Sequence, residues 1–161
     1  MPGDIFEQLP LFNELSPAQL QLLRPLFTSW DCYPGTVLFE QGDLADFLYL
    51  VVTGEVVIRY KPEDGPTITV TRVHSGGVVG WSAALGNRLY TSGAVCSDCS
   101  QMLRVRGRDL RKLCEDYPET GILVLERLAW IIAERLHNTH DQVVALLKQG
   151  LRSGIPSMKE V

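Results

Sequence analysis

The residues from Val78 to Ser92 are the chain's strongest candidates for ligand chemistry. Gly80 follows an apolar pair and precedes Trp81 to Leu85, a stretch that can form a short helix, and the small hydroxyl residues Thr91 and Ser92 come after it. The start of a helix presents unpaired backbone N–H groups and the positive end of a dipole, and both attract anions. The pattern indicates a cassette for a small ligand, although a glycine before a short helix also occurs in ordinary turns.

The other reactive residue types predict neither a metal centre nor catalysis. Cys96 and Cys99 have the spacing of a zinc knuckle, but no second pair or nearby histidine supplies two further ligands. Glu134 and His137 form a Glu-x-x-His pair that lies off the apolar seam of its helix. The sequence has no GK[ST] phosphate loop, Gly-x-Ser-x-Gly elbow or His-Glu-x-x-His pair, so we expect a non-enzyme without a metal or resident cofactor. We interpret the scattered cysteines as free thiols: Cys32, Cys96, Cys99 and Cys114.

Composition and charge narrow the class of protein further. The chain has 161 residues, 45% of them hydrophobic, which suits one globular domain over residues 1–150 with a loose tail at residues 151–161. Lys and Arg total 15 against 19 for Asp and Glu, and this net charge of −4 disfavours specific DNA binding and attachment to an anionic membrane. Because neither a membrane-spanning apolar run of ~18 residues nor a signal peptide is visible, we expect a cytoplasmic protein.

Closely spaced turn signals after Thr28 predict a β-rich body. Short apolar or alternating runs are separated by Pro-Gly, Gly-Asp and Gly-Gly pairs, a density typical of a roll or jelly-roll barrel. In the basic run from Leu103 to Lys112, arginines first alternate with apolar residues, which predicts a strand with one solvated face. The predicted strands cover residues 36–39, 47–52, 55–60, 67–73, 90–97 and 101–105.

Short helices are predicted on both sides of this body. Residues 4–28 carry a helical apolar stripe, with Ser16 as an N-cap and Pro17 at the first helical position. Pro25 is expected to end or kink this helix, because proline removes a backbone donor. A second short helix is expected over residues 108–116.

A long helix, predicted over about residues 119–149 and ended by Gly150, carries a candidate dimer seam. Its apolar positions alternate at spacings of three and four residues, as in a coiled coil. We expect a homodimer through paired helices; packing on the β body is the alternative, and we interpret Ile122, Leu125 and Leu128 in that way. The seam comprises Ala129, Ile132, Leu136, Thr139, Val143 and Leu146.

The stretch from Phe39 to Val56 resembles the signature of the cyclic nucleotide-binding domain family, the sensory module of catabolite activator-type regulators, cyclic-nucleotide-dependent kinases and gated channels. The resemblance covers about residues 6–147 and implies a fold that is mainly β with flanking helices: N-terminal helices, a jelly-roll-like β-roll, the cassette and a long C-terminal helix. The matching residues are Gln41, Gly42, Asp43, Asp46, Tyr49, Gly54 and Val56, with Pro34 and Gly35 upstream.

The resemblance also implies a ligand site, from which two side chains depart. In the family, the helix start and an arginine hold the cyclic phosphate, and a glutamate after a glycine binds the ribose hydroxyl. Gly80 matches the glycine, but Trp81 stands at the glutamate position and Tyr90 at the arginine position. Because a carboxylate and a cation are lost, cAMP and cGMP are expected to bind weakly or not at all.

The remaining cassette residues leave two alternatives open. Trp81 and Tyr90 either line a pocket for a flat or apolar ligand or fill it, and Arg88 either turns into the pocket or stays in solvent. The candidate ligand-binding residues are Gly80, Trp81, Ser82, Ala83, Arg88, Tyr90, Thr91 and Ser92.

The leading functional hypothesis is a non-catalytic, dimeric ligand-sensing module. It responds to a small-molecule effector, a cyclic nucleotide or another small anionic or aromatic compound, and signals through its C-terminal helix to a downstream protein partner. The alternatives are a ligand-independent scaffold and the sensory half of a transcription regulator, because the residues after Gly150 are too few for a helix-turn-helix.

Overall fold

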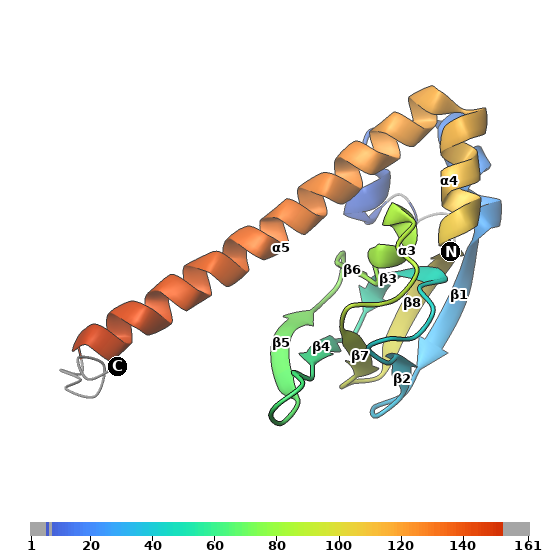
Figure 1. The fold of residues 1–161 in the computed structure, drawn as a ribbon. Helices are drawn as coiled ribbons and strands as arrows, with labels where there is room; N and C mark the ends of the chain where they lie inside the picture. Colours follow the sequence, from blue (N-terminus) through green and yellow to red (C-terminus); the bar gives the residue numbers. More distant parts are fainter. Residues whose placement is uncertain (1–5, 7, 153–161) are drawn as a thin grey trace. The chain divides into compact units, whose positions relative to one another are not determined.

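The chain folds as a β-roll with flanking helices, as the sequence predicts (Figure 1). The computed structural model describes residue 6 and residues 8–152. The chain divides into compact units of residues 1–131 and 132–161. In the first unit, one antiparallel sheet has the strand order β1-β8-β3-β6 and the other β2-β7-β4-β5. The strands are β1 (Phe27–Cys32), β2 (Val37–Phe39), β3 (Phe47–Thr53), β4 (Val56–Tyr60), β5 (Ile68–Val73), β6 (Val78–Val79), β7 (Gly93–Cys96) and β8 (Ser100–Arg106).

Within the stretch predicted to be helical, residues 4–28, an α-helix starts at Pro17 after its predicted N-cap and ends at Leu23, just before Pro25, as expected. In α2 (Pro17–Leu23), the Ser16 hydroxyl accepts a hydrogen bond from the Gln19 amide (3.2 Å), and the Gln19 side chain accepts one from the Ser16 amide (2.9 Å). Two 3₁₀ turns, η1 (Pro10–Phe12) and η2 (Arg24–Leu26), flank this helix.

Strand β1 is the element that the sequence does not predict. Its first residues, Phe27 and Thr28, fall in the stretch expected to be helical, and the 3₁₀ turn at Pro25 ends the helix before them. The strand lacks an alternating burial pattern, so its sequence gives no period of two. Its pairing with β8, with Phe27 opposite Val105, is what makes it a strand.

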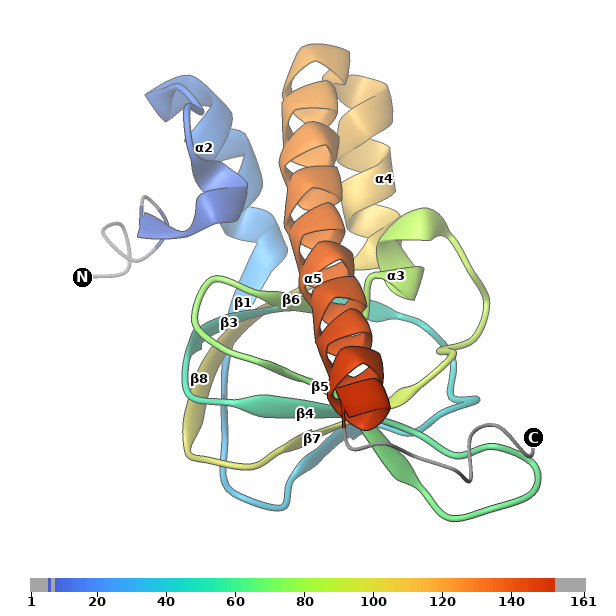
Figure 2. The same ribbon diagram turned by 90° about the vertical axis from the view of Figure 1, so that its left-hand side faces the viewer.

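The interior of the roll lies between the two sheets and is rich in aromatic residues. Its buried residues come from both sheets and from the loop after the cassette helix, and helices α2 and α4 lie at one end of the roll (Figures 1 and 2). The interior residues are Cys32, Phe39, Tyr49, Val51, Val56, Ile58, Val73, Val79, Tyr90, Ala94, Cys96 and Met102.

The two C-terminal helices are α4 (Gly107–Asp116) and α5 (Pro118–Arg152). Helix α5 continues through Gly150, so this glycine does not end it as we expected; a glycine disfavours a helix by only about 1 kcal/mol. The side chains of Thr139, Val143 and Leu146, three residues of the predicted seam, lie outside the described residues.

The face of α5 that packs on the first unit differs from the predicted one. Leu128 is buried as expected, but Ile122 and Leu125 are 55% and 43% exposed. Val124 is fully buried instead, one turn before Leu128. A side chain at Gly121 would overlap Cys114 of α4, so this glycine permits the close contact that turns the other face outward.

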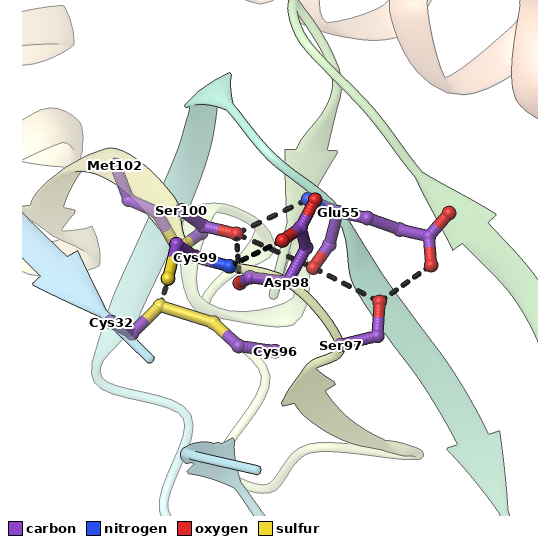
Figure 3. The surroundings of a disulfide bond; sticks show 8 residues. All are labelled: Cys32, Glu55, Cys96, Ser97, Asp98, Cys99, Ser100 and Met102. Carbon is purple, nitrogen blue, oxygen red and sulfur yellow. Dashed lines mark hydrogen bonds between the residues drawn. A yellow bond between two sulfur atoms is a disulfide. The ribbon is translucent and has the colours of Figure 1, made fainter. Parts of the chain in front are cut away.

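A disulfide joins Cys32 at the end of β1 to Cys96 at the end of β7 (Figure 3), which corrects the expectation of four free thiols. The two cysteines are separated by 64 residues and lie in different sheets, so their proximity depends on the packing of the sheets. The Met102 sulfur lies 3.6 Å from the Cys32 sulfur. Cys99 and Cys114 are free.

Polar contacts beside the disulfide connect the β3–β4 turn to the segment between β7 and β8 (Figure 3). The Ser97 hydroxyl donates to the Glu55 carboxylate (2.5 Å), and the Glu55 amide donates to the Ser100 hydroxyl (3.1 Å). Hydrogen bonds from Ser97, His74 and Arg72 lower the pKa of Glu55 to about 2. His74 is exposed, as expected, but it is bound to Glu55 at 2.7 Å.

The disulfide predicts a thiol count. Unreduced, denatured protein should give two reactive thiols per chain, Cys99 and Cys114, and reduced protein should give four. Thiol titration in denaturant, with and without a reductant, measures this directly. Four thiols before reduction, in protein purified without reductant under air, would contradict the disulfide.

Candidate ligand-binding site

The cassette begins where β6 leaves its sheet. Tyr49 of β3 pairs with Val79 of β6, and the chain then turns at Gly80 with a φ of +80°. A side chain at Gly80 would lie 2.9 Å from the Phe47 carbonyl oxygen and 3.2 Å from the rings of Phe39 and Tyr90. Glycine is therefore required here for both its backbone conformation and its small size.

The short helix α3 (Ser82–Leu85) follows, as the sequence predicts, and it is fixed at both ends. At its start, the Ala83 amide donates to the Gly80 carbonyl at 3.1 Å. At its end, the Arg111 guanidinium of α4 donates to the Ala83 carbonyl at 2.5 Å. Ser82 and Ala83 are buried. Because the Ala83 amide already has a backbone partner, fewer donors remain for an anion than a bare helix start would offer.

Tyr90 lies in the interior of the roll, at the position where the family resemblance implies an arginine. Its hydroxyl donates to the Phe47 carbonyl (2.5 Å) and accepts from the Phe47 amide (3.0 Å). Its ring stacks on Phe39, with the centroids 3.6 Å apart. Burial raises the pKa of Tyr90 to about 12, so the side chain is neutral at physiological pH and supplies no charge to an anion.

The other predicted ligand residues lie at different depths. Trp81 and Ser92 are partly buried, and Thr91 is exposed. Arg88 is also exposed, in agreement with the alternative that leaves it in solvent, while its carbonyl accepts a hydrogen bond from the Ala45 amide at 2.8 Å. The structure thus brings Gly80 and Tyr90 together around Phe47 and leaves the Arg88 side chain outside.

Sequence reasoning missed Arg104, a cation that points into the roll. The alternation in β8 places Arg104 on the same face as Met102, which belongs to the interior cluster. Leu103 and Val105, on the opposite face, are buried against the outer side of the sheet. The expected solvated face of this strand is thus correct for Arg106, which is exposed, and wrong for Arg104, which is half-buried. The pattern of alternation is visible in the sequence, but which face lies inward is not.

The described residues form neither a metal centre nor a membrane-spanning helix. No group of three or more His, Cys, Asp or Glu side chains there could hold a metal ion. Within the same part of the chain, every helix is too short or too polar to cross a membrane.

A model of the cyclic nucleotide-binding domain family matches residues 31–117, which is more than half of the chain. The chain belongs to the cyclic nucleotide-binding domain family. This cyclic nucleotide-binding domain is 30% identical over 128 residues to the cyclic AMP receptor protein of Thermus thermophilus, covering 79% of this chain and 57% of that protein. The chain thus spans less than two thirds of that relative's length.

Further relatives share the regulatory module. The domain is 27% identical over 109 residues to the cAMP-dependent protein kinase regulatory subunit of Yarrowia lipolytica, covering 68% of this chain and 28% of that one. A solved cyclic nucleotide-binding domain from Methylobacillus flagellatus superposes with a TM-score of 0.77 at 22% identity, covering 88% and 80% of the two chains, a likeness of fold. The protein is therefore a regulatory domain of the type found in receptor proteins and kinase regulatory subunits.

Tyr90→Phe is expected to lower the free energy of unfolding by about 1–3 kcal/mol, because it leaves the N–H and C=O of Phe47 without their partner. Urea unfolding measures the change, and Tyr60→Phe, at a side chain that is 41% exposed, is the matched control.

Since the pKa of Tyr90 rises from 10.0 to about 12 on folding, wild-type protein should also lose stability between pH 10 and pH 12. Equal alkaline loss in wild type and Tyr90→Phe would contradict this role.

Proposed function

We propose that this domain senses a small anionic or aromatic effector other than cAMP or cGMP. Family membership and the retained cassette backbone, with its turn at Gly80, support ligand binding. The observation that carries the choice of effector is the neutral Tyr90, which bonds to Phe47 where a cyclic phosphate would need a cation. Trp81 likewise offers no carboxylate to a ribose hydroxyl.

The second candidate is a ligand-independent scaffold, and the stacked pair of Phe39 and Tyr90 favours it. Two rings with centroids 3.6 Å apart fill part of the interior that a ligand would otherwise occupy. An effector would then have to displace the Tyr90 ring or bind beside it.

Titration of ligand-free protein with cAMP and cGMP tests the first proposal. Loss of two charge-assisted bonds weakens binding by roughly 10² to 10⁴, so calorimetry should show no micromolar binding by wild type. The double variant Trp81→Glu, Tyr90→Arg, checked for folding by circular dichroism, should bind more tightly than wild type. Micromolar binding by wild type would contradict the assignment of a different effector.

A thermal-shift panel of nucleotides, cyclic dinucleotides and organic acids separates the two candidate functions. A specific ligand at 100 times its dissociation constant should stabilise the protein by about 2.7 kcal/mol. No stabilisation by any member of the panel would favour the scaffold.

We also propose that the protein is a homodimer paired through α5 and that effector binding acts through this helix on a downstream protein. The uncovered apolar positions support pairing: Ile122, Leu125 and Leu136 are 55%, 43% and 56% exposed. Together with Ala129 and Ile132 they continue the predicted seam at alternating spacings of three and four residues. The proposed seam therefore begins at Ile122, about one heptad before Ala129, where the sequence analysis begins it.

Light scattering should give a mass of about twice the 18.0 kDa chain, and Leu136→Glu should shift it towards the monomer by placing a charge in the apolar seam. Ala145→Glu, at an exposed position away from the seam, is the matched control and should remain a dimer. A wild-type mass of one chain at all concentrations would refute the pairing.

A further inference from the structure

Arg104 is a half-buried cation that faces the interior of the roll, and no other described residue forms an ion pair with it. Its cross-strand neighbours are Thr28 of β1 and Tyr49 of β3. Its guanidinium carbon lies 4.4 Å from the ring centroid of Phe47 and 5.2 Å from that of Trp30. The aromatic rings attract the cation but cannot accept its five N–H donors in the way an oxyanion does.

The hydrogen-bonding capacity of Arg104 is only partly used. Arg104 forms a hydrogen bond with the Tyr49 hydroxyl. Burial raises the pKa of Tyr49, and the Arg104 cation opposes part of that rise. The Nε atom is buried and has no hydrogen-bond partner, and no ion pair between described residues includes Arg104. The half-buried guanidinium of Arg104 therefore has hydrogen-bonding capacity left for a ligand.

The position of Arg104 connects it to the cassette through one residue. Phe47 contacts the Arg104 guanidinium with its ring and binds the Tyr90 hydroxyl with its backbone, and its carbonyl lies against Gly80. The same ring contacts Arg106 at 4.9 Å. Arg106 lines a cavity of 180 Å³ together with Ala45, Asp46, Arg108 and Arg111, an environment with an excess of positive charge that attracts anions.

We propose that Arg104 binds the oxyanion of a flat small molecule inside the roll, supplying from β8 the cation that Tyr90 does not supply from the cassette. The planar guanidinium fork matches a carboxylate or a phosphate, and the rings of Trp30, Phe47 and Tyr49 offer flat apolar surface beside it. This inference rests on the proposed function, because it names the charge partner of the sensed effector.

The test compares wild type with Arg104→Met and Arg104→Lys, using benzoate and phenyl phosphate as probes. Arg59→Met is the matched control, because it removes a partly exposed strand arginine that lies 3.9 Å from the Glu40 carboxylate. Thermal unfolding midpoints are measured in buffer free of phosphate and sulfate, with sodium chloride matching the ionic strength of each probe. Wild type and Arg59→Met should rise by about 2 °C or more with at least one probe, Arg104→Lys should rise less, and Arg104→Met should not rise. The probe with the larger shift identifies carboxylate or phosphate as the preferred group.

The probe-free midpoints distinguish a binding role from a structural one. Arg104→Met should unfold at the same temperature as wild type or higher, because it replaces a half-buried guanidinium, whose Nε atom has no partner, with an apolar side chain. A lower midpoint for this variant with an unchanged probe shift would show that Arg104 has only a packing role. No shift of the wild-type midpoint with either probe would also overturn the inference.

A metabolite that binds Arg104→Met as tightly as wild type would overturn the inference while leaving the proposed function intact. If no metabolite of the panel raised the unfolding midpoint but a probe raised it through Arg104, the proposed effector-sensing function would be wrong and the oxyanion site would stand.

Discussion

The backbone of Phe47, at the start of β3, sets the geometry of the cassette. The register of β6 on β3 would place Trp81 opposite Phe47, but the chain has already turned away at Gly80. Phe47 pairs with Arg106 of β8 but has no strand partner on the β6 side, and there the Tyr90 hydroxyl satisfies its N–H and C=O groups. The loop that follows α3 is therefore held to β3 by a polar contact as well as by apolar packing, and the position of the Tyr90 ring follows from it.

This contact also changes the electrostatics of the roll. A tyrosine hydroxyl can replace a strand partner because it both donates and accepts, whereas an arginine at the same position could only donate. Retaining the two bonds to Phe47 therefore excludes a cation at residue 90. The half-buried Arg104 of β8 instead brings a charged group to the ring of Phe47. The backbone of Phe47 thus binds the neutral Tyr90 hydroxyl, and the ring of Phe47 contacts the Arg104 guanidinium.

The sequence predicted what depends on local chemistry. The capping box at Ser16, the turn at Gly80 and the helix after it follow from backbone preferences over a few residues, and the turn signals located most strands. Strand β1 could not be predicted, because its own residues lack a strand period and its partner β8 lies about seventy residues later. The disulfide and the inward face of Arg104 depend in the same way on how two sheets meet, which no local pattern records.

Helix α5 shows how one residue decides which of two apolar faces is buried. Val124 and Leu128 form a face with a spacing of four residues, and Gly121 brings it against α4. Ile122 and Leu125 are equally apolar, but they lie on the other side of the helix and remain exposed. These two residues belong to the unit of residues 1–131, whereas Leu136 belongs to the second unit. Hydrophobicity alone therefore does not decide which face of α5 is buried; the close approach that Gly121 permits does.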